Sequence, residues 1–267
     1  MTSTQFKMVV ARDSGSTLQA TFYAHHRKEN FKIVQSCGRE RTAYPSRRIT
    51  KLAYTVAGSE VSRIGHFKDT SVRQFQGHLT RFLKNTRAKA DVNLLDVKRV
   101  YAESDLSPLI AKFRLPVTSL NCSEVVGHSE DLEKLLERQG KNIYLRRICL
   151  NGTELAPRCI DLMVEMLKKL KIETFEMTTC SHSFGVQDLL QILKHWCSEG
   201  SPLIEMVIGV PCGSRFIIDV KGLLRKEIGA FDVSDISEEK IEVKSLLHGK
   251  RVTISKSYTA AVRVEFH

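Results

Sequence analysis

The sequence has no long apolar run and no secretory signal. A membrane-spanning helix needs about 18 consecutive, mostly apolar residues, and no segment of the 267-residue chain approaches that length. Residues 1–10 lack the positively charged start and apolar stretch of a signal peptide. The 42% hydrophobic and 27% charged residues are ordinary for a globular protein. These features predict an intracellular protein, cytoplasmic or nuclear, with no membrane partner.

The sequence also lacks the motifs of the common enzyme and cofactor classes. There is no G-x-S-x-G, no G-x-x-x-x-G-K-[ST] and no G-x-G-x-x-G. The 15 glycines are too sparse to form a phosphate-binding nest. We therefore expect a non-enzymatic protein without a cofactor. A hydrolase or transferase with an unrecognised site remains an alternative.

The seven cysteines are odd in number and include no C-x-x-C pair, which favours reduced thiols. The nearest approach to a metal site is the set Cys180, His182, His195 and Cys197. Its single-residue spacings are poor for zinc. His195 and Cys197 would also lie on opposite faces of a helix. We predict no metal site.

Two further features have simple structural interpretations. Asp232, Asp235, Glu238 and Glu239 form an acidic cluster, which we interpret as a solvated loop. Trp196, the single tryptophan, follows leucines at helical spacing. We expect it to be a core residue between repeat units, with a surface hot spot as the alternative.

Positive charge is concentrated in the first part of the chain. Residues 1–120 hold 21 Lys and Arg against 9 Asp and Glu, a net of +12, whereas the whole chain carries +11. Such asymmetry favours an acidic partner. The alternative function is therefore nucleic-acid binding through the basic face of one helix, with Arg39, Arg41, Arg47 and Arg48 adding charge from a loop. The candidate binding residues on that helix are Arg73, Arg81, Lys84, Arg87 and Lys89.

The N-terminal part is predicted to contain short strands followed by that helix. Leu18–Ala24, Phe31–Ser36 and Ile49–Val56 are rich in β-branched and aromatic residues. Their closeness favours an antiparallel meander. Helical spacing of apolar residues predicts an amphipathic helix over Thr70–Arg87.

The middle of the chain alternates strand-like and helix-like segments. Strand starts are separated by 23, 26, 29 and 31 residues, which suits one strand plus one helix per unit. The predicted strands are Leu94–Tyr101, Val117–Cys122, Ile143–Leu150, Ile172–Met177 and Leu203–Val210. The predicted helices are Asp131–Gln139 with Ser129 as N-cap, Ala156–Leu170 and Val186–Cys197.

The tail returns to β character. Phe216–Val220 is predicted to be a strand, and Lys221–Ile228 is ambiguous. Three antiparallel strands follow at Ile241–Leu247, Arg251–Ser255 and Ala260–Phe266.

The predicted class is α/β: a leucine-rich-repeat-like β–α array, with an open, curved parallel sheet and helices on one side, flanked by antiparallel β segments at both ends. We expect an N-terminal antiparallel β segment at residues 1–67. Residues 68–267 would form the array with C-terminal β hairpins, and the whole would be one continuous domain.

The segments Asp188–Trp196 and Ser201–Gly209 resemble the F-box-associated regions of nematode proteins (the FTH type). In those regions a helix ending in a lysine/tryptophan element leads, after a break, into a strand. The strand-like runs Ile143–Leu150 and Ile172–Met177 and the closing Gly249–Phe266 hairpin are similar to the same domains. The resemblance covers residues 45–267.

This resemblance implies recognition of a partner or substrate for a cullin-type ubiquitin ligase, with no active-site residues. The Leu/Pro-rich F-box helices that normally come first are not visible in Met1–Arg47. The resemblance therefore extends to the recognition domain and not to docking on the Skp-type adaptor. A lone recognition domain, a truncated gene product and a decoy all remain open.

Overall fold

The computed structural model describes part of the chain. It gives the backbone of residues 4–12, 18–26, 49–57, 68–69, 92–100, 102, 110, 113, 116–199, 202–227, 230–258 and 260–267. Side chains are described from residue 94 onward within these ranges, except at Tyr258. The chain forms two compact units, residues 1–135 and 136–267.

The first unit contains a mixed sheet. Its strand order is β4-β1-β2-β3-β5-β6. β1 pairs antiparallel with β2 and β4, whereas β2, β3, β5 and β6 run parallel to one another. The strands are β1 (Thr4–Arg12), β2 (Leu18–His26), β3 (Ile49–Ala57), β4 (Lys68–Asp69), β5 (Val92–Val100) and β6 (Val117–Val125).

The predicted N-terminal meander is wrong. β2 and β3, which include the predicted strands Leu18–Ala24 and Ile49–Val56, pair in parallel. The long connection from His26 to Ile49 can return the chain to the same end of the sheet, which a tight hairpin cannot do. β1 was not predicted at all. The predicted strand Phe31–Ser36 and helix Thr70–Arg87 lie outside the described residues.

The second unit combines a parallel part and an antiparallel part in one sheet. Its strand order is β7-β8-β9-β13-β12-β11-β10, with β7, β8 and β9 parallel and the remaining pairs antiparallel. Its strands are β7 (Arg147–Asn151), β8 (Thr174–Thr178), β9 (Glu205–Gly209), β10 (Phe231–Ser237), β11 (Lys240–Ser245), β12 (Arg251–Tyr258) and β13 (Ala261–Phe266). Its helices are α4 (Arg158–Lys169), α5 (Val186–Glu199) and α6 (Gly213–Lys226). α3 (Ser129–Gln139) crosses the boundary between the units. The α/β class with parallel and antiparallel strands is confirmed.

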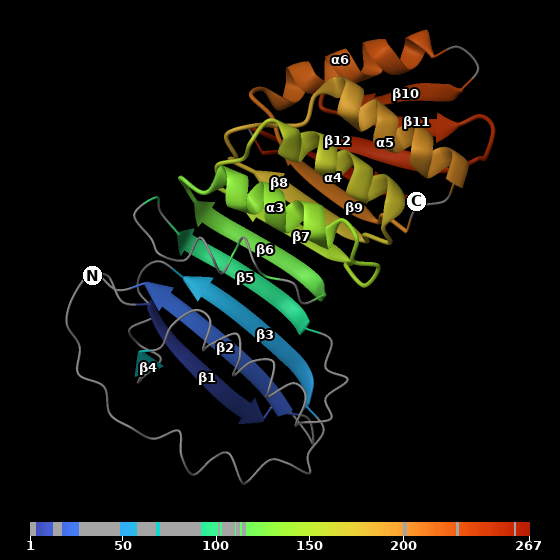
Figure 1. Cartoon of the computed structure of the whole chain (residues 1–267). Coiled ribbons are helices and arrows are strands. Elements are labelled where there is room, and N and C mark those ends of the chain that lie inside the picture. Colours follow the sequence, from blue (N-terminus) through green and yellow to red (C-terminus); the bar gives the residue numbers. More distant parts are fainter. Residues whose placement is uncertain are drawn as a thin grey trace. The chain divides into compact units, whose positions relative to one another are not determined.

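Alternation along the parallel strands builds the core of this unit. Six side chains on one face of β7, β8 and β9 are almost fully buried: Ile148, Leu150, Phe175, Met177, Met206 and Ile208. α4, α5 and α6 lie against that same side of the sheet (Figure 1). Each helix turns a stripe of buried residues toward the strands, as amphipathic helices do.

Three local predictions need correction. Phe216–Val220 belongs to helix α6, because Phe216, Val220 and Leu224 recur at helical spacing on its buried side. The acidic cluster is not one loop, since Asp232 and Asp235 pair with β11 inside strand β10. α3 is capped by His128, whose carbonyl oxygen accepts the first helical hydrogen bond from Leu132 N, so Ser129 is already helical.

Trp196 is a core residue, as predicted. Its side chain is buried, and its ring centroid lies 5.2 Å from the ring centroid of Phe266 in β13. The Nζ of Lys250 lies 4.9 Å from the indole centroid and donates a 2.7 Å hydrogen bond to the Trp196 carbonyl oxygen. Trp196 therefore joins α5 to the antiparallel strands rather than filling a gap between repeat units.

Candidate functional site

The face of the second sheet opposite its helices carries polar and charged side chains. They occupy the alternate positions of the strands whose other residues form the core. We call this the open face. It is defined by Arg147, Cys149 and Asn151 of β7, Thr174, Glu176 and Thr178 of β8, Glu205 and Val207 of β9, and Arg263 and Glu265 of β13.

Strand register arranges these side chains in rows that cross the sheet. One row runs from Arg147 through Thr174 and Glu205 to Glu265. It continues through Thr253 of β12 to Glu242 of β11. The next row contains Cys149, Glu176, Val207, Arg263, Ser255 and Lys240. Residues far apart in sequence are thus neighbours on one surface.

Charges on the open face are partly paired. Glu205 and Glu265 lie directly opposite each other, an arrangement that repels. The Nε of Arg263 lies 3.1 Å from Glu205 Oε1 and offsets this repulsion. Arg147 Nε donates a 3.1 Å hydrogen bond to Thr174 Oγ1. The face offers both signs of charge, as protein-recognition surfaces do.

Cys149 lies on the open face in β7, at one end of its row, and is poorly suited to nucleophilic chemistry. Burial raises the pKa of its thiol to about 11, and the neighbouring carboxylate of Glu176 contributes to the rise. A thiol of this kind is almost wholly protonated at neutral pH, and the thiolate is the nucleophile. The open face therefore combines charged and polar side chains with a thiol that is a weak nucleophile at neutral pH.

The carboxyl ends of successive parallel strands share an unusual backbone conformation. In each of four strands, one residue near the carboxyl end has a left-handed backbone conformation, with φ between 51° and 57°. This residue lies two positions after a buried apolar residue of the strand. These residues are Arg99 after Val97, Glu124 after Cys122, Gly152 after Leu150 and Thr179 after Met177. The residue that follows is buried at Val100, Val125 and Thr153. Cys180, which follows Thr179, is half-buried, and its Sγ lies 3.7 Å from the Leu150 carbonyl oxygen.

Side-chain hydrogen bonds hold this edge in the second unit. Asn151 Oδ1 accepts from the hydroxyl of Thr179 at 2.6 Å and from that of Thr178 at 3.3 Å. Gly152 N donates to Thr179 Oγ1 at 3.0 Å. Ser181 Oγ accepts from Leu155 N at 2.9 Å. The polar side chains here serve mainly to tie one strand–helix connection to the next.

The residues considered for metal binding are not brought together. Cys180 Sγ lies 3.4 Å from the Thr178 carbonyl oxygen, and His182 Nδ1 lies 3.2 Å from Ser181 Oγ. His195 Nδ1 instead faces Glu199 within α5 at 3.8 Å. Cys197 is buried in the same helix. Among the residues that the structure describes, no group of three His, Cys, Asp or Glu side chains could hold a metal ion.

The predicted basic site lies outside the described residues. This applies to Arg73, Arg81, Lys84, Arg87 and Lys89, and to the arginines of the preceding loop. The open face was not identified from the sequence. Its signal was the set of polar residues that alternate with core residues in short strands, such as Arg147, Cys149 and Asn151.

Comparison with known proteins gives no relative. No protein-family model, no curated protein and no solved structure matches the chain significantly. No helix in the described part of the chain is both long and apolar enough to span a bilayer.

Proposed function

We propose that the chain is a non-enzymatic protein–protein recognition module built as a leucine-rich-repeat-like array. Its open face would contact the partner protein. The observation that carries the proposal is the structural repeat at the ends of β5, β6, β7 and β8. A left-handed residue, followed by a buried or half-buried residue, recurs there in four successive strands.

The sequence around two of these strands follows the leucine-rich pattern L-x-x-L-x-L-x-x-N/C. In the first, the pattern positions are Leu145, Ile148, Leu150 and Thr153, all buried. In the second they are Ile172, Phe175, Met177 and Cys180. Cys180 matches the cysteine variant of the last position, and Thr153 replaces the usual asparagine. The match supports an array rather than an unrelated α/β fold.

Repeat arrays use the sheet face that their helices leave uncovered as a binding surface. Here that face carries Arg147 and Arg263 among carboxylates, and arginine is enriched in protein interfaces. Because the pKa of the Cys149 thiol is raised, this thiol is protonated at neutral pH and is a poor nucleophile. Recognition without catalysis is the function that these groups support best.

The link to a cullin-type ubiquitin ligase comes from the resemblance to nematode F-box-associated regions. In this proposal the partner is a ligase substrate or a ligase component. The chain would then act in recognition, and adaptor docking would fall to another segment or another protein.

The proposal is tested by affinity capture from cell extract with the full chain. The face variant combines Arg147→Glu with Glu176→Lys, which exchanges charges and keeps the net charge constant. The matched control exchanges Arg215→Glu and Asp219→Lys on the exposed side of α6, where the two charges lie 4.0 Å apart. We expect the same specific partners with the wild type and the control, and their loss with the face variant.

Equal recovery by the face variant would reject the open face as the binding surface. Recovery of no specific protein by the wild type would reject the recognition module. A specific partner set without ligase components or ubiquitinated proteins would reject only the ligase link.

Nucleic-acid binding is the second candidate, because residues 1–120 carry a net charge of +12. Phosphate contacts of this kind weaken steeply with salt. Fluorescence anisotropy with single-stranded and duplex oligonucleotides at low salt tests it. No detectable binding there would exclude this function.

A further inference from the structure

The exposed apolar side chains of the second unit are unevenly distributed. Five of them lie at one edge of its sheet, the edge where β7, β8 and β9 begin. We call this set the apolar rim: Ile143, Tyr144, Ile204, Leu246 and Leu247. Ile143 is 65% exposed and Leu247 is 77% exposed. Scattered single residues of this kind are ordinary, but a line of them along one edge indicates a contact surface.

Strand directions explain why residues so far apart in sequence share this edge. Ile143 and Tyr144 precede β7, and Ile204 precedes β9. β13 and β11 run opposite to β9, so the turn after β11 returns to the same edge with Leu246 and Leu247. Five strand spacings of about 4.8 Å separate β7 from β11, which makes the rim roughly 24 Å long.

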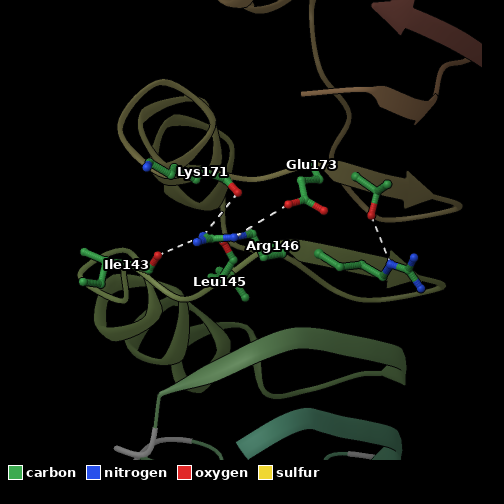
Figure 2. A network of polar contacts seen from close by, with 7 residues as sticks. Ile143, Leu145, Arg146, Lys171 and Glu173 are labelled. Atoms are coloured by element: carbon green, nitrogen blue, oxygen red, sulfur yellow. Dashed lines mark hydrogen bonds and ion pairs between the residues drawn. The ribbon is translucent and has the colours of Figure 1, made fainter. Parts of the chain in front are cut away.

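The turn that carries Ile143 is held rigidly by Arg146 (Figure 2). Arg146 Nη1 donates to the carbonyl oxygens of Ile143 at 2.9 Å and Leu145 at 3.2 Å. The same nitrogen reaches the Lys171 carbonyl oxygen at 3.4 Å. Its Nε lies 3.7 Å from Glu173 Oε1. The guanidinium thus joins the turns before β7 and β8, and Ile143 stays exposed on a fixed backbone.

The turn that carries Leu246 and Leu247 is similarly ordered. Gly249 N donates to the Ser245 carbonyl oxygen at 2.9 Å, and Ser245 N donates to the Lys250 carbonyl oxygen at 2.8 Å. Leu246 N donates to the Ala230 carbonyl oxygen at 3.1 Å. Both leucines are therefore exposed on a hairpin turn whose backbone is held by hydrogen bonds.

Cationic side chains flank the rim. Lys141 and Lys171 lie in the turns before β7 and β8, and Lys244 and Arg251 border the hairpin that carries the leucines. All four are exposed. Two acidic residues lie at this edge: Glu173 is engaged by Arg146, and Asp232 lies opposite Lys244, which leaves the cations in excess. The rim therefore combines protruding aliphatic groups and a tyrosine with positive charge. The positive charge favours an anionic binding partner.

We propose that the apolar rim binds an anionic lipid membrane surface peripherally. Side chains that protrude from separate turns can enter the headgroup boundary without a complementary pocket, which a protein partner would have to supply. Flanking Lys and Arg gain from anionic headgroups, and tyrosine favours the interface. Peripheral contact needs no spanning segment. This inference is independent of recognition through the open face.

Co-sedimentation of the full chain with phosphatidylcholine vesicles, with and without phosphatidylserine, tests the proposal. The rim variant is Ile143→Ser with Leu247→Ser, one change on each turn. The control is Ile218→Ser with Ile236→Ser, which removes apolar side chains that are 63% and 54% exposed but lie away from this edge. Thermal unfolding of both variants checks that the fold is retained, and Tyr144→Ser provides a milder second rim variant.

We expect the wild type and the control to bind vesicles that contain phosphatidylserine, and the rim variant to bind about tenfold less. Equal binding by the rim variant and wild type would overturn the proposal, because the basic residues 1–120 would then account for the binding. No binding of the wild type to phosphatidylserine vesicles at low salt would also overturn it. An acidic protein partner for this edge would then be the alternative.

Discussion

The hydroxyl of Thr179, a residue with a left-handed backbone at the end of β8, donates a 2.6 Å hydrogen bond to Asn151 Oδ1 at the end of β7. A β-branched residue rarely adopts such a backbone, so the hydrogen bonds of the hydroxyl offset conformational strain. Thr179→Val keeps the shape and strain but loses the hydroxyl. We expect it to lower the free energy of unfolding by about 0.5–1.5 kcal/mol, measured by urea denaturation.

Thr179→Gly is the matched control. It loses the same hydrogen bonds but relieves the left-handed strain, which costs about 1–2 kcal/mol. The glycine variant should therefore be more stable than the valine variant. Equal stability of the two would show that the backbone at position 179 is not strained.

Cys149 should react slowly with alkylating reagents. The pKa of its thiol is raised to about 11, first by burial and then by the negative charge of Glu176. Glu176→Gln removes that charge and should lower the pKa, so that Cys149 reacts faster at pH 9. Mass spectrometry of alkylated peptides across a pH series measures this, with the exposed Cys212 as internal reference. An unchanged pH profile in the Gln variant would show that burial alone raises the pKa.

Apolar periodicity was sufficient to predict much of the strand and helix alternation. The expected helix Val186–Cys197 corresponds to α5, and the expected strand Ile172–Met177 overlaps β8. The expected strand Phe216–Val220 failed because three adjacent apolar residues imitate a buried strand. In helix α6, Phe216 and Ile217 are buried, whereas Ile218 is exposed to solvent.

Strand direction and the geometry of the open face could not be predicted from the sequence, for a different reason. Whether β2 and β3 pair in parallel depends on the path of the long connection between them, which their own residues do not encode. The left-handed positions were equally hidden, because Arg99, Glu124 and Thr179 are not glycines. The open face likewise became recognisable only when register placed Glu205 opposite Glu265.

Glu165 should contribute a small, pH-dependent stabilisation. Its carboxylate lies 2.6 Å from Lys169 Nζ and 2.9 Å from Lys168 Nζ, and these lysines lower its pKa from 4.5 to about 2. Because the folded pKa is depressed, the contribution is complete above about pH 4.5 and is lost as the pH falls toward 2. The pair is largely exposed, so the effect at pH 7 should stay below about 1 kcal/mol.

Urea denaturation of the wild type and Glu165→Gln at several pH values measures this contribution. The difference between the two should be present at pH 7 and vanish near pH 2. A difference that stayed constant through acid would mean that the glutamine changes helix α4 rather than an ion pair.

Two glycines should respond in opposite directions to alanine. Gly222 lies inside helix α6, and an added Cβ would meet no atom within 4 Å. Because glycine costs a helix interior about 0.5–1 kcal/mol relative to alanine, Gly222→Ala should raise the free energy of unfolding by that amount.

Gly127 has φ of +78°, and a Cβ there would lie 2.4 Å from the Cβ of Ala102. Gly127→Ala should therefore destabilise the chain by more than about 1 kcal/mol, from left-handed strain plus overpacking. Thermal and urea unfolding of both variants compares them directly. A neutral Gly127→Ala would show that Ala102 can shift to admit the added Cβ. A destabilising Gly222→Ala would show that α6 requires flexibility at that position.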